Sequence, residues 1–196
     1  MESGRSSIRR PRSSIRSRRP GSESASESSS ASSSSQCSMA EATTGLVTTG
    51  IKRGVVDEEV RQEAVRVMIA RNAPAAASFA DLGVSAATDV TGFGLMGHLK
   101  EMARASGVDA ALDAARVPLI DEALELAAAN VVPGGTSDNM EYVSDVADWP
   151  EEMPRPERLL LCDAQTSGGL LIVLPSAEAP GLMAELARRG VPEAAI

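Results

Sequence analysis

Apolar residues recur every three or four positions along residues 57–72, DEEVRQEAVRVMIARN. This spacing matches the ~3.6 residues per turn of an α-helix, so the apolar side chains fall on one face. Asp57 stands at the start of the run, where a carboxylate accepts a hydrogen bond from a free N–H of the first turn. The segment therefore predicts an amphipathic helix with Asp57 as its N-cap. The residues expected to face the core are Val60, Ala64, Val67 and Met68.

Other segments show the same helical spacing, and their ends carry residues typical of helix termini. Glycine supplies the left-handed residue that ends many helices, proline suits the first turn, and serine caps the first free N–H groups. On these signals the predicted helices are 74–83 ended by Gly83, 95–107 ended by Gly107, 118–132 begun by Pro118, and 176–190 capped by Ser176 and ended by Gly190.

Shorter apolar runs bounded by glycine, proline or polar residues predict strands. Residues 168–175, GGLLIVLP, give the clearest strand, 84–90, VSAATDV, predict a buried one, and 108–114, VDAALDA, alternate weakly. Residues 133–139, PGGTSDN, predict a turn. Because helices lie between the strands along the chain, the pattern indicates an α+β or α/β domain with helices packed on a sheet.

The beginning of the chain lacks this patterning. Residues 1–42 are mostly Ser and Arg with almost nothing apolar to bury, so we expect a disordered N-terminal tail. Three origins fit the composition: a transit peptide, a basic arm that contacts RNA or phosphate groups, or translation from a wrong start or a shifted reading frame. The abrupt change into ordered-looking sequence near Gly45, with no linker between, favours the third origin.

Charge divides the chain in the same way. The net charge is -8, and residues 1–38 hold 7 Arg and 3 Glu, which leaves 12 basic and 24 acidic residues on the remainder, a balance of -12. Such an acidic body argues against nucleic acid as the main partner and suits a soluble cytoplasmic protein. No apolar run approaches the ~18 residues needed to span a bilayer, so we expect no membrane partner. Cys37 and Cys162 form no metal motif and are expected as unpaired, reduced thiols.

One acid lies at the end of the predicted strand 84–90, in a position where ligands often bind. Asp89 is followed by Gly92 and Gly94, and then by the predicted helix. Open α/β sheets bind ligands beyond their strand ends, glycines let the backbone approach a ligand, and the N–H groups of a helix start attract anions. A carboxylate beside phosphate-binding amides suits a Mg-nucleotide site. On spacing alone, the alternative that Asp89 only caps the turn or helix stays open.

Two further features allow both a functional and a structural interpretation. Residues 163–171, DAQTSGGLL, place several polar side chains before a buried strand, where they either bond phosphate oxygens or satisfy their own backbone. His98, the only histidine, lies one turn past Gly94, and a structural role is favoured. The sequence contains no phosphate loop of the GxxxxGK[ST] type and no HExxH motif. Spacing alone therefore indicates a globular domain with a pocket for an anion or a metal.

The combination of four sequence blocks is more specific for a protein family than the spacing of single residues. In order along the chain they closely resemble the C-terminal half of selenide, water dikinase, also called selenophosphate synthetase, from about Gly45 onward. Related kinases and aminoimidazole synthetases share the general fold without this series. The blocks are TTGIKRG at 48–54, ATDVTGFGLMGHLKEMA at 87–103, VPLIDEALELAAANVVPGGTSDN at 117–139 and DAQTSGGLLIVLP at 163–175.

The resemblance implies a fold, a reaction and site residues. The fold is α+β, with helices packed on a mixed β-sheet, like the C-terminal domain of the aminoimidazole synthetase/selenophosphate synthetase superfamily. The reaction uses ATP, selenide and water to make selenophosphate, AMP and orthophosphate, for selenocysteine or selenouridine synthesis, with Mg²⁺ bridging the phosphates. The family's magnesium-ligating aspartate falls on Asp89. Its glycine-rich nucleotide-binding element retains Thr44 and Gly45, with Thr43 in place of the first glycine.

Part of the family pattern has no counterpart in this sequence. The reactive Cys or selenocysteine and its partner Lys belong to an N-terminal segment that is not found here, Cys37 does not match that motif, and the catalytic residues stay unknown. We therefore expect a gene fragment, paired in a homodimer or with a separate N-terminal domain, or else a non-catalytic nucleotide-binding module or a degenerate gene product. The expected divisions are a disordered tail over 1–42, a helical remnant over 43–83 linking to the absent N-terminal ATP-binding domain, and a C-terminal selenophosphate-synthetase-like domain over 84–196.

Overall fold

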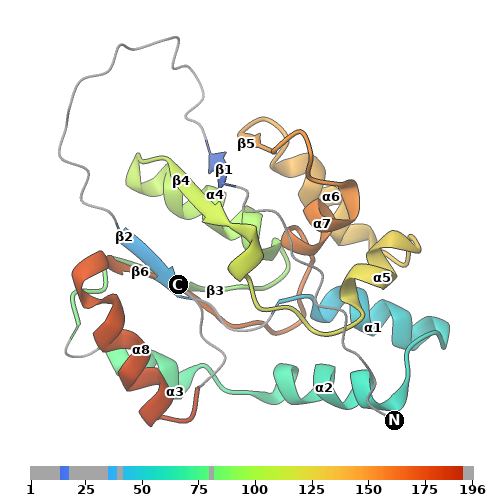
Figure 1. Ribbon diagram of the computed structural model, residues 1–196, viewed down its shortest axis with the longest axis horizontal. Helices are drawn as coiled ribbons and strands as arrows, with labels where there is room; N and C mark the ends of the chain where they lie inside the picture. The colour runs from blue at the N-terminus through green and yellow to red at the C-terminus, as the bar shows by residue number, and fades with distance from the viewer. Residues whose placement is uncertain (1–13, 18–34, 39–41, 80–81, 192–196) are drawn as a thin grey trace.

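The computed structural model describes residues 14–17, 35–38, 42–79 and 82–191, and it has the predicted α+β architecture. Helices separate most of the short strands along the chain, and the described strands form two three-stranded sheets (Figure 1). The α-helices are α1 Thr44–Arg53, α2 Glu58–Ile69, α3 Ala73–Ala76, α4 Gly94–Ser106, α5 Ala123–Ala128, α6 Gly134–Tyr142, α7 Arg155–Leu161 and α8 Ala179–Arg188, with 3-10 turns η1 Ala77–Phe79, η2 Ala114–Arg116 and η3 Ser176–Glu178.

The first sheet holds the strand that ends at the predicted metal ligand. Its order is β2–β6–β3, and β6 (Leu170–Pro175) pairs antiparallel with both β2 (Ser35–Ser38) and β3 (Ala86–Asp89). In this register Asp89 lies opposite Leu170. The pairing therefore brings the end of β3 next to the start of β6.

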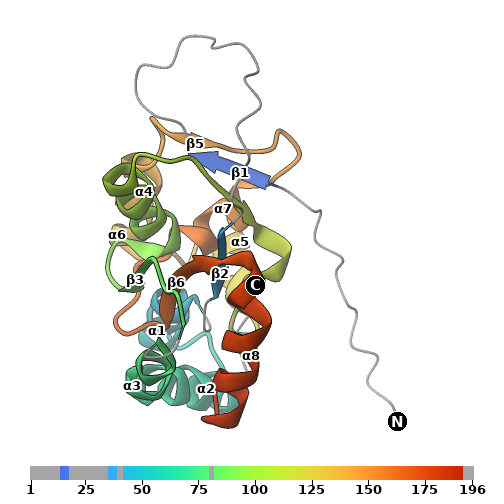
Figure 2. The ribbon, with the colours of Figure 1, turned by 90° about the vertical axis from the view of Figure 1, so that its left-hand side faces the viewer.

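In Figure 2, strands β1 and β5 of the second sheet lie at the top of the molecule, above the first sheet. Its order is β4–β1–β5, and β1 (Ser14–Ser17) pairs antiparallel with β4 (Ala110–Asp113) and with β5 (Ala147–Asp148). An isolated parallel bridge joins Ala42 to Leu119. This bridge ties the chain just before α1 to the segment just before α5.

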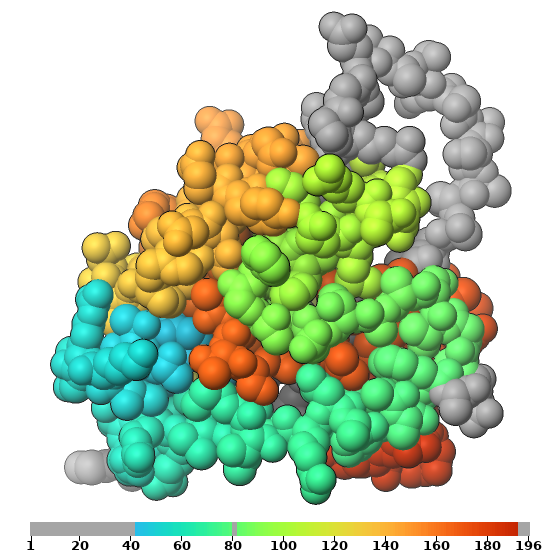
Figure 3. Space-filling view, turned by 180° about the vertical axis from the view of Figure 1, so that it is seen from behind, coloured from blue at the N-terminus to red at the C-terminus, as the bar shows by residue number. Residues whose placement is uncertain are grey.

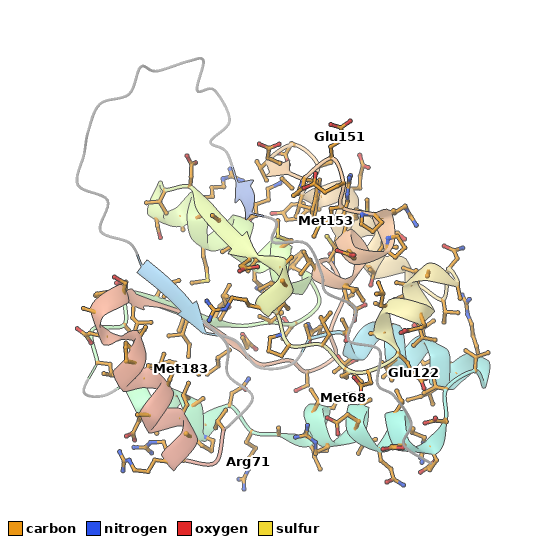
Figure 4. The ribbon with its side chains drawn as sticks, viewed as in Figure 1. Met68, Arg71, Glu122, Glu151, Met153 and Met183 are labelled. Atoms are coloured by element: carbon orange, nitrogen blue, oxygen red, sulfur yellow. The ribbon has the colours of Figure 1, made fainter. Side chains whose placement is uncertain are left out.

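Apolar side chains in the described part of the chain form a core of three clusters. One lies between α4 and α7, a second joins α1 and α2 to α5 and α7, and a third lies between β6, α3 and α8. Figure 4 shows one methionine from each cluster: Met153 in the first, Met68 in the second and Met183 in the third. Because the chain has only 2% aromatic residues, flexible methionines and aliphatic side chains fill the core instead.

Several predicted helix ends are confirmed. The α2 helix begins after Asp57, whose carboxylate accepts a hydrogen bond from the Val60 N–H at 3.0 Å. The α4 helix ends at Gly107 with a φ of 64°, and Gly190, just after α8, has a φ of 78°. Both glycines adopt the left-handed conformation that the sequence predicts for a helix end.

The predicted buried strand at 84–90 is wrong in its burial. The side chains of β3 alternate between half-buried and exposed, because β3 is an edge strand of its sheet. The predicted helix at 118–132 is shortened to α5. The backbone of residues 118–120 is bonded to Ala42 instead, through Ala42 N–H to Pro118 O at 2.9 Å and Ile120 N–H to Ala42 O at 3.4 Å.

Three local predictions are corrected by tertiary contacts. The predicted turn at 133–139 is the start of α6, with Pro133 as its N-cap. Gly83 does not have the left-handed φ expected of a helix-ending glycine, and its N–H donates to the Glu178 carboxylate at 2.6 Å. Ser176 begins η3, and Glu178 occupies the N-cap position of α8.

Most of the predicted tail at 1–42 lies outside the described residues, so its disorder stays a prediction. Within that range the structure describes β1, β2 and Ala42. The divisions at 42 and 83 also stay predictions, although α1 and α2 share a core cluster with α5 and α7. Among the described residues, no helix combines the length and apolar character needed to cross a membrane.

The Asp57 cap gives a first test of the local analysis. Replacing Asp57 with Ala removes the acceptor for the Val60 N–H, and we expect a loss of about 1 kcal/mol in the free energy of unfolding. Asp57→Asn removes the charge but keeps a capping oxygen, so it should stay close to wild type. Urea unfolding of the three proteins measures the difference. Equal losses in both variants would mean that charge, rather than the cap, matters at this position.

Candidate functional site

Four segments that are distant in sequence converge at the middle of the molecule. They are the turn at 91–94 after β3, the start of α6, the start of α1, and residues 163–169 between α7 and β6. Figure 3 shows part of this region: the segment around residue 165, in orange, lies between α1 in blue, the α2–α3 region in teal and α4 in green. The segment at 163–169 is therefore the centre of the arrangement.

Asp163 is fully buried and holds three of these segments together. One of its oxygens, Oδ2, accepts hydrogen bonds from the N–H groups of Gly45 at 2.8 Å and Leu46 at 3.1 Å. The other, Oδ1, accepts from the Thr136 hydroxyl at 2.8 Å. The first N–H groups of a helix have no partner within it, so the carboxylate caps α1 from a segment 118 residues away.

Small residues allow the backbones to approach closely around Asp163. A Cβ on Gly45 would lie 2.1 Å from the carbonyl oxygen of Ala164, so any side chain there would force the two segments apart. The Ala164 N–H in turn donates to the Thr136 hydroxyl oxygen at 3.0 Å. The residue before α1, Thr43, has a φ of 87°, and its hydroxyl oxygen accepts from the Ile120 N–H.

The buried network shifts two pKa values. Burial raises the pKa of Asp163 to about 6, while the hydrogen bonds from Thr136, Leu46 and Gly45 act in the opposite direction. Burial, together with the neighbouring Asp163 charge, raises the pKa of the Cys162 thiol to about 12. Cys162 is therefore protonated at neutral pH and inaccessible, which excludes it as a thiolate nucleophile.

The turn at 91–94 packs directly on the Asp163 segment. Gly94 has a φ of 66°, and a Cβ there would lie 2.6 Å from the carbonyl oxygen of Cys162. Gly92, in contrast, is exposed and has open space around its Cα. Of the two glycines predicted to admit a ligand, Gly94 serves close backbone packing, and only Gly92 faces open space.

His98 supports the turn from α4. Its Nε2 accepts a hydrogen bond from the Thr91 N–H at 3.0 Å, so Nε2 carries no proton in this arrangement. Burial lowers the pKa of His98, while Asp89 and Glu101 act to raise it. The structural role favoured from the sequence agrees with this contact.

Asp89 is exposed at the end of β3, beside the same turn. Within the described residues its carboxylate forms no hydrogen bond, and the N-cap residue of α4 is Phe93, which has no side-chain cap bond. The described part of the chain also offers no acceptor to the N–H groups of Gly92 and Phe93. Among the described residues, a carboxylate and two N–H groups without hydrogen-bond partners therefore occur within residues 89–93, just before a 13-residue helix.

The predicted nucleotide-binding residues lie deeper. Thr44 is fully buried, and its hydroxyl oxygen has no hydrogen-bond partner in the described structure; Gly45 gives its N–H to Asp163. Gln165 joins the two regions, because its N–H donates to the Thr91 carbonyl at 3.2 Å. Among the described residues there is no group of three His, Cys, Asp or Glu side chains that could hold a metal ion by itself.

Comparison with known proteins identifies the family. A family profile described as AIR synthase related protein, C-terminal domain, matches residues 22–196. The chain belongs to this family. It also resembles the selenide, water dikinases of Carboxydothermus hydrogenoformans, at 42% identity over 147 residues, and Myxococcus xanthus, at 43% over 155 residues. The selenide, water dikinase of Escherichia coli (strain K12) is 46% identical over 136 residues.

These alignments cover most of the chain but less than half of each relative. They span 75% and 78% of this chain, and 43% and 44% of the first two relatives; for the third the shares are 68% and 38%. The predicted assignment to the C-terminal part of selenophosphate synthetase is therefore confirmed. The family match begins at residue 22, inside the stretch predicted as a tail.

The sequence did not indicate the partners of the residues that organise this domain. Asp163 belonged to the candidate polar segment at 163–171, whereas Thr136 and Asn139 appeared only within the predicted turn at 133–139. The available signal was the co-occurrence of PGGTSDN and DAQTSGG, since two polar turns in one chain can satisfy each other across the fold. The roles predicted for Asp89, Thr44 and Gly45 stay predictions.

The buried carboxyl of Asp163 should make stability depend on pH. Its pKa rises from 3.8 to about 6 on folding, so the folded protein holds this proton more tightly than the unfolded chain. This contribution is fully present below the unfolded pKa of 3.8 and is lost as pH rises through the folded pKa of about 6. The shift corresponds to a loss of about 3 kcal/mol in the free energy of unfolding.

Denaturation of wild type and Asp163→Asn across this pH range measures that contribution. The variant cannot titrate here, so its profile should lack the fall. Asp145→Asn is a matched control. A hydrogen bond from Lys100 lowers the pKa of exposed Asp145, so titration of Asp145 changes stability with pH in the opposite direction to that of Asp163. Parallel profiles for wild type and Asp163→Asn would contradict the assignment.

Proposed function

We propose that this chain supplies the part of a selenide, water dikinase that faces the Mg-nucleotide. The whole reaction would use ATP, selenide and water and release selenophosphate, AMP and orthophosphate. The similarity to selenide, water dikinases and the order of the four motif blocks support this proposal. Since the chain spans less than half of those relatives, the activity is proposed for an assembly that includes the remaining half.

The observation that carries the proposal is the free polar cluster after β3. Asp89, with its exposed carboxylate, precedes Gly92 and Phe93 by three and four residues, and the N–H groups of these two residues have no acceptor in the described part of the chain. Mg²⁺ prefers carboxylate oxygens, and phosphate oxygens favour the N–H groups of a helix N-terminus. The two halves of a Mg-phosphate group therefore each find a suitable partner there.

A magnesium ion fits this site only together with a nucleotide. Protein-bound Mg²⁺ commonly takes one or two carboxylates and completes its shell with phosphate oxygens and waters. Asp89 would hold the ion, and the Gly92 and Phe93 amides would hold phosphate oxygens. When bound, the ion neutralises phosphate charge. This chain's own contribution is to orient the phosphates against a fixed strand end.

Thr44 and Gly45 are proposed as further nucleotide contacts. Their proposed role rests on the family resemblance, since the Gly45 N–H is engaged by Asp163 and the Thr44 hydroxyl, which has no partner in the described residues, is fully buried. The residue that attacks or transfers the phosphoryl group stays unknown, since the buried Cys162 thiol is unsuitable. We propose that it belongs to the remaining half, carried on a separate N-terminal domain. We also propose that the chain pairs as a homodimer or with that domain, in the cytoplasm.

A second function is a non-catalytic nucleotide-binding module. It is favoured by the absence, in the described residues, of any three-residue group that could hold a metal ion alone. A single carboxylate with two amides could retain a Mg-nucleotide without turning it over. The two functions differ in whether adding the N-terminal half of a relative produces selenide-dependent AMP.

Replacing Asp89 with Asn tests the site directly. The variant keeps the side chain's size but removes the charge. We expect the free energy of unfolding to change by less than about 1 kcal/mol, because the carboxylate is exposed and does not cap α4. In an assembly completed with an N-terminal half, Mg-ATP turnover should be lost. Thermal melts and an ATPase assay measure the two effects.

Asp109→Asn is a matched control for this test. It removes the same charge from an exposed loop position beyond the far end of α4, roughly 20 Å along the helix from its start. Turnover should match wild type in this variant. A destabilised but fully active Asp89→Asn protein would show that Asp89 only supports the turn.

We expect that the chain alone does not make selenophosphate. One carboxylate cannot supply all the metal ligands that a triphosphate needs, and the described residues place no suitable nucleophile at the site. Purified chain incubated with Mg²⁺, ATP and selenide should release no AMP above the rate without selenide. Steady selenide-dependent AMP release by the chain alone would contradict this expectation.

A further inference from the structure

The turn between β3 and α4 depends on side chains outside it for its hydrogen bonds. Within the turn, the Gly94 N–H donates to the Thr91 carbonyl at 2.9 Å. From outside, His98 accepts from the Thr91 N–H, and the Asn139 amide donates to the Gly92 carbonyl at 2.8 Å. The shape of the turn is therefore set by contacts from α4 and α6 as well as by its own sequence.

Asn139 makes a second bond with the same nitrogen. Its Nδ2 also donates to the carbonyl oxygen of Cys162 at 3.0 Å, and the residue is only 6% exposed. Two backbone carbonyls that approach each other repel unless a donor with two hydrogens lies between them. A neutral side-chain amide supplies both hydrogens from one atom, whereas a hydroxyl supplies one and a carboxylate none.

The Cys162 and Gly92 carbonyls belong to segments with different structural roles. Cys162 is followed by Asp163, whose carboxylate caps α1, and Gly92 belongs to the turn with the free N–H groups. The strand pairing of Asp89 with Leu170 sets the position of the Asp89 backbone independently of α6. Asn139 thus connects the turn, but not Asp89 itself, to the buried network.

We propose that Asn139 is a positioning residue that holds the Gly92 and Phe93 amides at a fixed separation from the Asp89 carboxylate. The inference rests on the proposed function and assigns a task to the PGGTSDN segment that the family comparison does not. Without Asn139 the carboxylate stays on its strand, while the turn is free to shift. The metal-binding and phosphate-binding groups then no longer match one ligand.

Amide hydrogen exchange in the full chain tests the first half of this inference. In Asn139→Ala, the Thr91 and Gly94 amides should exchange about tenfold faster, as expected for the loss of a hydrogen bond that braces the turn. The Val90 amide, bonded to the Gly169 carbonyl, should keep its rate. Asn139→Ser keeps one donor, so its Thr91 and Gly94 exchange rates should lie between those of wild type and Asn139→Ala. The serine variant replaces the alanine variant if the latter does not fold.

Asn72→Ala is the matched control for the exchange measurement. Asn72 also donates its amide to a backbone carbonyl, that of Gly168 at 3.0 Å, and in the described structure it makes no hydrogen bond to residues 91–94. Its loss should leave the Thr91 and Gly94 rates unchanged. Equal acceleration in the Asn72 and Asn139 variants would mean a general loss of stability and would overturn the inference.

Paramagnetic broadening by Mn²⁺-ATP tests the second half. In the wild-type chain the ion should broaden the amide signals of Asp89, Gly92 and Phe93 together. In Asn139→Ala the Asp89 signal should still broaden, while the broadening of Gly92 and Phe93 relative to Asp89 falls. An unchanged ratio would overturn the positioning role and leave the proposed function intact. No broadening at Asp89 in wild type would remove the proposed metal site, and this inference with it.

Discussion

The carboxylate of Asp163 is the interaction on which the central arrangement of this protein depends. It lies away from water, yet it accepts hydrogen bonds from two backbone N–H groups of α1 and from the Thr136 hydroxyl of α6. A buried carboxylate without such donors would be costly, and a helix start without an acceptor would leave its N–H groups unpaired. The α1 N–H groups supply donors to the carboxylate, and the carboxylate supplies an acceptor to them. The ends of three segments are therefore held at one point.

The close contacts around that point explain the glycines in the motif blocks. A side chain at Gly45 would strike the Ala164 carbonyl, one at Gly94 the Cys162 carbonyl, and one at Gly168 the Val90 carbonyl. Several glycines that look suited to ligand approach are therefore needed for backbone packing. Gly92 is different, since the space beside it is open. Of these four glycines, Gly92 alone is free to approach a ligand.

The buried network and the proposed binding groups are neighbours with separate physical roles. Asp163, Thr136 and Asn139 are buried and hydrogen-bonded to groups within the protein, so they provide rigidity. Asp89 and Gly92 are exposed at the edge of the same network. A rigid interior next to free polar groups is the arrangement that lets a site bind a charged ligand without reorganising.

The sequence by itself determined the features that depend on neighbours along the chain. The apolar spacing and capping residues of α2 and α4, the left-handed Gly107 and Gly190, and the apolar strand β6 all follow from local periodicity and backbone preference. The order of the four motif blocks was enough to indicate the family. These signals are local or cumulative, so they survive without knowledge of the fold.

Only the tertiary structure decided what each polar turn does. Residues 118–120, predicted as helical, form hydrogen bonds to Ala42 instead. The segment 133–139, predicted as a turn, forms the start of α6. The capping of α1 by Asp163 joins residues 118 positions apart, and Asn139 joins two carbonyls from different segments. No local pattern encodes such partners, because a buried polar group takes its partner from whichever segment the packing of the core brings within reach.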